Sequence, residues 1–421
     1  MTASAETRAP RIALLTSDFL PNPGGIAAGL DGLLRSSGGM IEWHVYTTVR
    51  RGTSDDRAYP CPVTRLDVKH PGERPGDGVL LLRKINSLAG HIRAPAAARA
   101  AVAAIRGGLR PDFFLLGCWD HAASYWAAAC REAGIRYMFL AHGTEIRGRR
   151  GWVMQRRRKI DLCHATAVLT NSRATAAAAL ALGCDENRVV VIHPGVDASS
   201  LERLPPEELN DVRQAVGVRD VPFILTMGRL IRRKGFDLVL SAFNAIASDF
   251  PSVHLVIAGD GPERSLIATM AGESRWAGRI HLTGHVLERE RKALFQECEF
   301  FTMANRETPG DMEGFGLVFR EAAYCGKASI GGRNGGVPEA VREGETGLLV
   351  DTSQGSMPLE LAMRSLLASP EKAREMGRLG HSLVKARGLW LHAAATYRDV
   401  FQAFMQAGNE EAESGRIPGS P

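Results

Sequence analysis

Two glutamates, Glu313 and Glu321, flank the start of a predicted helix in the second half of the chain. The helix is expected to begin near Phe315, so the backbone N–H groups of Gly316 and Leu317 would have no partner within it. Together with the positive end of the helix dipole, these groups form a site that suits a phosphate. The glycines on either side of Phe315 let a ligand approach the backbone closely.

The two carboxylates add polyol binding to this phosphate site. Glu321 would lie inside the helix, where both of its oxygens can bind the hydroxyls of a ribose. Glu313, in the loop before the helix, could bind a second polyol on the other side of the phosphates. The arrangement therefore predicts a nucleotide diphosphate sugar as the ligand. The alternative is that Glu313 only caps the helix and that Glu321 is a solvated helix residue.

A second loop offers positive charge for the same ligand. The stretch MGRLIRRKGFD follows an apolar run typical of a strand and carries Arg229 and Lys234. A departing diphosphate gains negative charge, so cations placed beside it would stabilise the transition state. Arg232 and Arg233 in the same loop are interpreted as solvated side chains.

Both halves of the chain alternate apolar strands with amphipathic helices, which predicts an α/β fold with two parallel sheets, each covered on both faces. Ligands of such sheets bind beyond the carboxyl ends of the strands. We expect a first domain over residues 1–198, a polar linker over 199–220 and a second domain over 221–385. The acidic segment 408–421, rich in Pro and Gly, is expected to be a disordered tail.

Composition places the chain among globular proteins of a reducing compartment. Of its 421 residues, 45% are hydrophobic and 23% charged, and no apolar run is long enough for a membrane helix. The start of the chain lacks the apolar core of a signal peptide. The seven cysteines contain no C-x-x-C pair, which favours free thiols over a disulfide framework or a zinc site. We therefore expect a cytoplasmic protein.

A basic run, Arg147–Lys159, contains seven basic residues and no acidic one. It could form part of an acceptor cleft, or a helix that contacts anionic lipid at the inner face of the membrane. The alternative is a solvated helix face, which suits a chain in which arginine is abundant. Nucleic acid is not expected as a partner, because Trp152 is the single aromatic residue of the run and base stacking would need several.

The motifs taken together resemble a known family. The second half contains, in order, MGRLIRRKGFD, IAGDGPE, LTGHV, MEGFGLVFREAAYCG, GGRNGGVPEAV and TGLLVD; the first half contains PNPGG, AHGTE, TNSRAT and VIHPGVD. This pattern resembles family 4 of the retaining glycosyltransferases over about residues 11–400, and Glu313 and Glu321 match the E-x7-E motif of that family. The variants look nearest to the branch of phosphatidylinositol mannosyltransferases and exopolysaccharide glycosyltransferases.

The resemblance implies the GT-B fold, in which two Rossmann-like domains face a cleft, and a helix over 386–407 that crosses back to the first domain. It implies a donor-binding set made of Gly25, Arg229, Lys234, Glu313, Phe315, Gly316, Leu317, Val318 and Glu321. Catalytic roles fall to His142, Arg229, Lys234 and Glu313.

Within these sets the resemblance assigns individual contacts. Arg229 and Lys234 would hold the diphosphate, and Glu313 would bind hydroxyls of the donor sugar. His142 would lie beside that sugar, and the main chain of Gly25 would contact the phosphates or the acceptor. Arg320 departs from the apolar residue usual in the family and is expected to point to solvent.

The implied activity is that of a hexosyltransferase. A hexose would pass from a UDP- or GDP-sugar, GDP-mannose among them, to a hydroxyl of a lipid, glycan or small metabolite with retention, by front-face displacement. No D-x-D motif is present, so no metal and no cofactor other than the donor are expected. The alternative is a nucleotide-sugar epimerase, or a binding protein without catalysis, on the same architecture.

Overall fold

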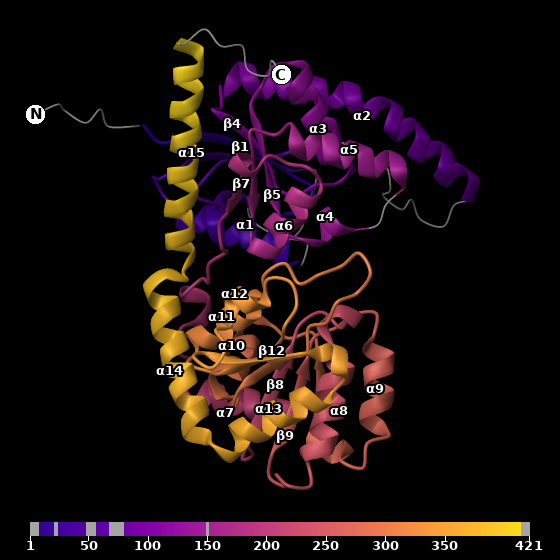
Figure 1. Ribbon diagram of the computed structural model, residues 1–421, viewed down its shortest axis with the longest axis vertical. Helices are drawn as coiled ribbons and strands as arrows, with labels where there is room; N and C mark the ends of the chain where they lie inside the picture. The colour runs from indigo at the N-terminus through magenta and orange to yellow at the C-terminus, as the bar shows by residue number, and fades with distance from the viewer. Residues whose placement is uncertain (1–7, 21–23, 48–55, 67–79, 149–150, 414–421) are drawn as a thin grey trace, which may run out of the picture. The chain divides into compact units, whose positions relative to one another are not determined.

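The computed structural model describes residues 8–20, 24–47, 56–66, 80–148 and 151–413 (Figure 1). Two compact units divide the chain. Unit 1 comprises the residues up to His193 together with those from Trp390 onward, and unit 2 comprises Pro194–Leu389.

Unit 1 is built on a parallel sheet with the strand order β3-β2-β1-β4-β5-β6-β7. Its strands are β1 (Arg11–Thr16), β2 (Glu42–Thr47), β3 (Val63–Arg65), β4 (Phe113–Leu116), β5 (Tyr137–Ala141), β6 (Ala167–Thr170) and β7 (Val189–Val191). Its helices are α1 (Gly25–Ser36), α2 (Leu80–Gly108), α3 (His121–Glu132), α4 (Thr144–Arg147), α5 (Trp152–Cys163), α6 (Arg173–Ala181) and α15 (Trp390–Glu413).

Both faces of the unit 1 sheet are buried, which explains why its strands are continuous apolar runs. In β1, Leu14 faces a core shared with α1 and α15. Its neighbours Ala13 and Leu15 face the opposite core, shared with α2 and α3. Successive side chains of a strand point to opposite faces, so both sets must be apolar.

Unit 2 repeats this plan with the strand order β10-β9-β8-β11-β12-β13, again parallel. Its strands are β8 (Phe223–Met227), β9 (His254–Ala258), β10 (Ile280–Gly284), β11 (Phe301–Met303), β12 (Ser329–Gly332) and β13 (Gly347–Val350). Its helices are α7 (Pro206–Val216), α8 (Phe236–Ile246), α9 (Arg264–Gly272), α10 (Glu288–Glu297), α11 (Leu317–Tyr324), α12 (Val337–Ala340), α13 (Met357–Ala368) and α14 (Pro370–Arg387).

The segment expected to be a linker, 199–220, is instead an ordered part of unit 2. It contains α7, which packs Leu209 and Val212 against Ala293 of α10. The adjacent prolines that suggested a connector start the helix, because proline fits the first turn, where no N–H partner is needed. Unit 2 accordingly begins at Pro194 rather than after residue 220.

The C-terminal helix α15 belongs to unit 1, where Figure 1 shows it in yellow. It buries Trp390, Tyr397 and Phe401 in the same core as α1. The helix ends at Glu413, so residues 408–413 are helical rather than disordered, as befits a stretch rich in good helix formers. The rest of the expected tail, 414–421, lies outside the described residues.

In each sheet the strands are added first to one side of the starting strand and then to the other. We call the point where this order changes the sheet reversal, and two loops of each unit lie there. This point lies between β1 and β4 in unit 1 and between β8 and β11 in unit 2. Open α/β sheets bind ligands at such positions, outside the carboxyl ends of the strands. The loops after these strands are therefore where functional side chains are expected.

Candidate functional site

The side chain of Glu313 lies in the loop between β11 and α11 and is buried, with the residue only 7% exposed. One carboxylate oxygen, Oε2, accepts hydrogen bonds from Arg233 Nη1 at 2.5 Å, Lys234 Nζ at 2.6 Å and Asn305 Nδ2 at 2.6 Å. A solvated helix cap would have none of these partners. Glu313 is instead the centre of a buried ionic cluster.

Burial and the neighbouring charges shift the pKa values of both Glu313 and Lys234. Burial alone would raise the pKa of the Glu313 carboxyl, but the positive charges of Lys234 and Arg233 hold that pKa below its ordinary value. Burial lowers the pKa of the Lys234 ammonium group, and the Glu313 carboxylate opposes that change. Glu313 therefore remains an anion, which accepts hydrogen bonds and does not act as an acid near neutral pH.

Backbone contacts with the glycine-rich turn after β12 hold the Glu313 loop. The Gly336 N–H group donates to the Glu313 carbonyl at 2.9 Å. A Cβ atom on Gly335 would lie 2.0 Å from that same carbonyl oxygen, and Gly335 has a φ of 54°. Only glycine meets both demands without strain. The turn is thus a support for Glu313.

Asn305 is a buried member of the cluster that sequence reasoning missed. It follows β11, is fully buried and donates to Glu313. A Cβ atom on Gly332 would lie 1.9 Å from the Asn305 carbonyl oxygen, so β12 runs closely against it. The available signal was its position after an apolar run, at a strand end beside the sheet reversal.

The loop after β8 divides into buried and exposed cations. Arg233, interpreted as solvated from the sequence, instead pairs with Glu313 and with Asp311, the latter at 3.0 Å. Arg232 does face solvent, and Arg229 is also exposed. Lys234 and Glu313, 79 positions apart, are brought into contact, whereas Arg229 has no side-chain partner among the described residues.

Helix α11 begins at Leu317, two positions later than expected, because Gly316 adopts a left-handed conformation with a φ of 88°. A Cβ atom on Gly316 would lie 2.7 Å from the ring of Phe319. The N–H groups of Leu317 and Val318 lie in the first turn and have no acceptor within the helix. These groups remain available to an acceptor from outside the helix, one residue later than the predicted pair at Gly316 and Leu317.

Phe315, a member of the predicted donor-binding set, packs against Arg320, which was expected to be solvated. Phe315 is buried, and the Arg320 guanidinium lies 4.4 Å from the centre of its ring. Arg320 Nη1 donates to the Pro194 carbonyl at 2.7 Å. Burial lowers the pKa of Arg320 to about 10. The expectation that Arg320 points to solvent is wrong, because its guanidinium lies over the Phe315 ring and donates to the Pro194 carbonyl.

Glu321 lies on α11 and pairs with Arg291 of α10, with 2.6 Å between Arg291 Nη1 and Glu321 Oε1. Its second oxygen has no protein partner among the residues that the structure describes. Arg291 was not predicted, since its sequence neighbours are all charged and nothing marks it locally. The pair holds the carboxylate in place and leaves one oxygen for a ligand hydroxyl.

In unit 1, His142 follows β5, and hydrogen bonds hold both its ring and its backbone. Its Nε2 lies 2.8 Å from the Gly117 carbonyl, which can only accept, so Nε2 carries the proton. Its backbone N–H donates to the carboxylate of Glu145. Asn171 donates to its carbonyl at 3.2 Å. The imidazole therefore has a defined orientation with Nδ1 as an acceptor when neutral.

Asp18 is a second residue that sequence reasoning missed. It follows β1, and the pKa of its carboxyl is raised above the ordinary value. Burial is the main cause and Asp120 adds to it, while His142 opposes the increase. Gly24 lies against it, since a Cβ atom there would be 3.8 Å from Asp18 Oδ1. Gly25 is exposed at the start of α1, with open space where its Cβ would be. Of the predicted residues of unit 1, His142 thus lies near enough to Asp18 to affect its carboxyl, whereas Gly25 has no contact with it at the Cβ position.

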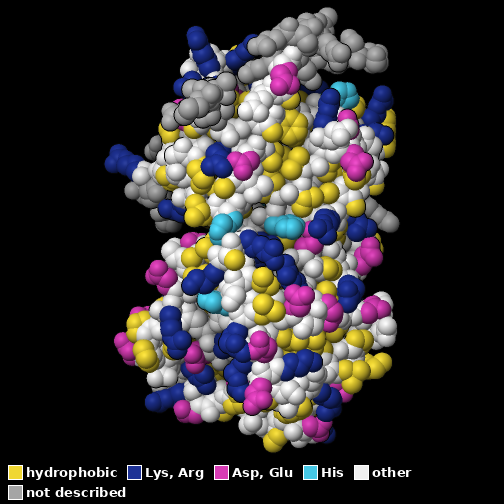
Figure 2. Space-filling view, turned by 60° about the vertical axis from the view of Figure 1, so that its left-hand side comes forward, with side chains coloured by type: hydrophobic (Ala, Val, Ile, Leu, Met, Phe, Trp, Pro, Cys, Tyr) yellow, Lys and Arg dark blue, Asp and Glu magenta, His cyan; other side chains and the backbone are white. Residues whose placement is uncertain are grey.

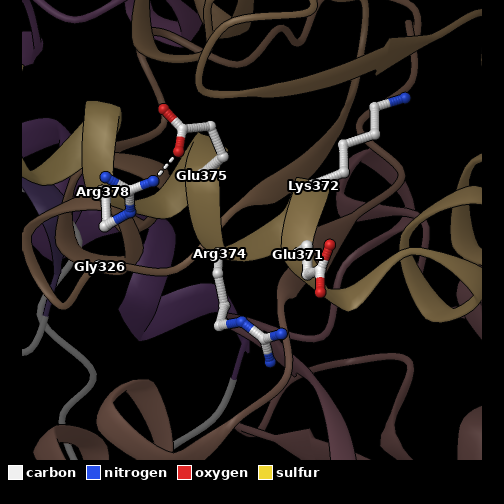
Figure 3. A pocket seen from close by; sticks show the side chains of 6 residues that line it. All are labelled: Gly326, Glu371, Lys372, Arg374, Glu375 and Arg378. Carbon is white, nitrogen blue, oxygen red and sulfur yellow. Dashed lines mark ion pairs between the residues drawn. The ribbon is translucent and has the colours of Figure 1, made fainter.

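An open hollow of about 570 Å³ lies elsewhere on unit 2 and contains none of the predicted residues (Figure 3). Its lining comes from Gly326, after the end of α11, and from charged side chains of α14, where Arg378 pairs with Glu375. The first turn of α11, where phosphate binding was predicted, lies at the opposite end of that helix. This hollow is therefore not part of the candidate site.

Two family models match the chain along most of its length. Residues 41–200 match the model described as Glycosyltransferase Family 4, and residues 210–382 match the model described as Glycosyl transferases group 1. The chain belongs to glycosyltransferase family 4. The family predicted from the order of the motifs is thereby confirmed.

Curated relatives resemble about half of the chain. A GDP-mannose-dependent alpha-(1-6)-phosphatidylinositol monomannoside mannosyltransferase of Mycolicibacterium smegmatis is 30% identical over 216 residues, which are 51% of this chain and 56% of the relative. A D-inositol 3-phosphate glycosyltransferase of Mycobacterium bovis is 34% identical over 170 residues, which are 40% of this chain and 34% of the relative. The chain thus matches about half or less of the length of these relatives.

Solved structures match nearly the whole chain. Anabaena Alr3699/HepE in complex with UDP-glucose superposes with a TM-score of 0.73 at 18% identity, over 93% of this chain and 99% of that one. Sucrose-phosphate synthase from Thermosynechococcus elongatus gives 0.72 at 19% identity, over 94% and 100%. These likenesses confirm the predicted GT-B fold of this family 4 glycosyltransferase, with two parallel sheets covered by helices.

Proposed function

We propose that this chain is a retaining hexosyltransferase, which transfers a hexose from a nucleotide diphosphate sugar to a hydroxyl of an acceptor. The observation that carries the proposal is the buried Glu313 carboxylate, held by Lys234 and Arg233 one short loop before the free N–H groups of α11. Burying the Glu313 carboxylate costs free energy, yet the protein keeps it beside a helix end suited to phosphate. Recognition of a nucleotide-sugar donor requires such an arrangement.

Each part of the donor has a partner in unit 2. The diphosphate would meet the first-turn N–H groups of α11, with Arg229 and Lys234 supplying positive charge. The ribose hydroxyls would bind the free oxygen of Glu321. The sugar hydroxyls would donate to Glu313 Oε1, the oxygen that the three protein donors do not occupy.

The proposed chemistry is a front-face displacement. Retaining glycosidases use one carboxylate as a nucleophile, but Glu313 is held by three donors and is assigned to hydroxyl binding. The donor phosphate would accept the proton of the acceptor hydroxyl as the sugar–phosphate bond breaks and the sugar passes through an oxocarbenium-like state. The side chains contribute position and charge stabilisation, with His142 beside the sugar as a hydrogen-bond partner.

The names of the similar proteins narrow the donor and acceptor that we propose. One relative is GDP-mannose-dependent and acts on phosphatidylinositol monomannoside, and one solved structure contains UDP-glucose. We therefore propose a GDP- or UDP-hexose as donor and a lipid, glycan or small polyol as acceptor.

We further propose that no metal takes part at the diphosphate, since Arg229, Lys234 and the end of α11 supply positive charge there. Excess EDTA should then leave the transfer rate of the purified protein unchanged. A rate that falls with EDTA and returns with Mg²⁺ or Mn²⁺ would contradict this assignment.

We also propose a peripheral contact of α5 with anionic lipid on the cytoplasmic side. Trp152 is 74% exposed, and Val153 and Ile160 are exposed beside Arg156 and Lys159. Aromatic and basic side chains on one helix suit the headgroup region. Of the predicted basic run, Arg149 and Arg150 lie outside the described residues.

Part of the basic run is not available for this contact. Arg158 of the same helix is buried and donates to the carbonyls of Glu145 and Gly148. On the face drawn in Figure 2, basic and acidic side chains are interspersed and form no continuous basic surface. Within the described residues no helix is both long and apolar enough to cross a bilayer.

The contact of α5 with lipid is tested at its exposed tryptophan. Trp152→Ala should weaken sedimentation of the protein with phosphatidylglycerol vesicles, and equal sedimentation of the variant and the wild type would refute the contact.

The donor proposal is tested by thermal shift with UDP, GDP, ADP and dTDP. A nucleotide at a hundred times its Kd stabilises the protein by about 2.7 kcal/mol, a shift that the melting temperature reports. We expect one nucleotide to stabilise wild type but not Glu321→Ala, while the exposed control Glu345→Ala responds like wild type. If no nucleotide stabilises wild type, the α11 entrance is not a donor site and the proposed function fails.

A further inference from the structure

We propose that Cys163 and Cys184 are a site of reversible intramolecular disulfide formation driven by peroxide. Their sulfur atoms lie 2.9 Å apart although the residues are 21 positions apart in the sequence. Cys163 is the last residue of α5, and Cys184 follows α6. Two separate elements thus bring their ends together at a pair of thiols.

The geometry requires little movement. A disulfide has an S–S length of about 2.0 Å, so the sulfurs need to approach by only about 0.9 Å. Cys163 is the last residue of α5 and Cys184 lies in irregular chain beyond α6, where the backbone adjusts more easily than inside a helix. All seven cysteines are free and lie within the described residues, and this is the only sulfur–sulfur contact found there.

The two thiols differ in a way that sets the order of the reaction. Cys184 is 8% exposed, whereas Cys163 is more accessible. Burial, and after it the neighbouring Cys163 thiol, raise the pKa of the Cys184 thiol to about 12, and the Lys159 ammonium opposes this increase. Cys163 is therefore the sulfur that a peroxide reaches first, and Cys184 is the resolving thiol.

The reaction balances with hydrogen peroxide as the oxidant. The Cys163 thiolate attacks one peroxide oxygen, the O–O bond breaks, and a sulfenic acid and hydroxide form; the hydroxide leaves as water with the thiol proton. The Cys184 sulfur then attacks the Cys163 sulfur, forming the S–S bond and releasing the second oxygen as water with the Cys184 proton. Overall, two thiols are oxidised and one peroxide is reduced to two waters; a dithiol reverses the bond by exchange.

The bond would join the end of α5 to the chain that follows α6. A Cβ atom on Gly183 would lie 3.3 Å from Lys159 Nζ, so α5 already packs closely on this turn. The helix that carries the exposed Trp152 would then be fixed at its far end. The inference about the thiols is independent of the proposed transferase activity.

Peptide mapping tests the proposal on the full-length protein. Trypsin cleaves after Lys159, Arg173 and Arg188, so the two cysteines fall in separate peptides, 160–173 and 174–188, with one cysteine each. After mild peroxide treatment and alkylation we expect these two peptides to be joined, with a mass about 2 Da below their sum. Dithiothreitol should separate them.

Variants distinguish a specific pair from general oxidation. Cys184→Ser should stop at a Cys163 sulfenic acid that dimedone traps, and Cys61→Ser should form the joined peptides like wild type. Melting curves of the reduced variants establish that each is folded before oxidation. Over-oxidation of Cys163 without joined peptides in wild type, or joining of either cysteine to a different one at equal yield, would overturn the proposal.

Discussion

One oxygen of Glu313 receives three hydrogen bonds from the protein, and this single arrangement explains most of the residue-level behaviour of the site. Removing one partner of a buried ion pair leaves the other charge unpaired, which is usually more harmful than losing the interaction itself. Lys234 is such a partner, and it is also a cation assigned to the diphosphate. Arg232, two positions earlier, is itself exposed and pairs with Asp237 rather than with Glu313.

This contrast gives a matched pair of substitutions in one loop. Lys234→Met should lower kcat/KM for donor turnover by about 10²–10³-fold, because charge stabilisation of the leaving diphosphate is lost. Arg232→Met should change it less than about twofold, as exposed ion pairs contribute little. Steady-state kinetics of both variants check this, and equal losses would show that only the total charge of the loop matters.

At the scale of elements, close packing of helices and strands depends on a few small or titratable residues. Trp390 of α15 lies on α1 because Gly32 has no side chain there. In unit 2, His254 of β9 stacks on His281 of β10, with 2.8 Å between Nδ1 and Nε2. Each contact predicts a response to a defined change.

Gly32→Ala should destabilise the protein although alanine is the better helix former. The new Cβ atom would lie 2.2 Å from Trp390 Nε1, and such overpacking costs about 1–3 kcal/mol. Gly107→Ala in α2 is the control: no atom lies near its Cβ position, and we expect stabilisation of up to about 1 kcal/mol. Thermal unfolding checks both, and a stabilised Gly32→Ala variant would show that α15 does not pack as described.

Acidification should weaken unit 2 through the histidine pair. Burial lowers the pKa of His254, as do the neighbouring His281 and Arg279, and burial also lowers the pKa of His281. Below pH about 6.5 the unfolded chain binds protons that the folded pair does not, so stability falls as the pH drops from there.

The measurement is the melting temperature as a function of pH between 7.5 and about 5, where histidine titrates. Replacing His281 by Asn should flatten the decline, because the unfolded state then loses one proton-binding group. Replacement of the exposed His285 by Asn should leave the slope as in wild type. An unchanged slope in the His281 variant would assign the acid sensitivity to other groups.

On the scale of the whole molecule, the chain passes from unit 1 to unit 2 and then returns. Unit 2 is continuous, Pro194–Leu389, whereas unit 1 needs α15 from the C-terminus to complete its core. The two units therefore differ in how they depend on the end of the chain.

A chain that stops at Leu389 should lose the fold of unit 1. Burial of a large apolar side chain contributes about 1.5–3 kcal/mol, so loss of Trp390, Tyr397 and Phe401 approaches the whole stability of a domain, about 5–15 kcal/mol. Unit 2 expressed alone, 194–389, should stay folded and retain nucleotide binding. Limited proteolysis and circular dichroism check both, and a protease-resistant unit 1 in the shortened chain would contradict this.

Much of the architecture could be predicted from the sequence, because the apolar runs and helical periods are local. The parallel sheets followed from the alternation of strand and helix patterns, and the GT-B fold and the family from the resemblance carried by the order of the motifs. Glycine-rich turns and the position of Glu313 before a helix are also local features, and the structure places them where they were expected. The connector at 199–220 was misjudged because proline near a helix start looks like proline in a loop.

The partners of each charge were decided only by the tertiary structure. Arg233 and Arg232 are adjacent in sequence, yet one pairs with Glu313 inside the protein and the other faces solvent. Arg291 reaches Glu321 because α10 and α11 lie against each other, and Arg233 reaches Glu313 because the adjacent parallel strands β8 and β11 end at the same edge of the sheet. Periodicity along a chain specifies which face of an element is buried, whereas the distance between two distant side chains depends on how the elements pack.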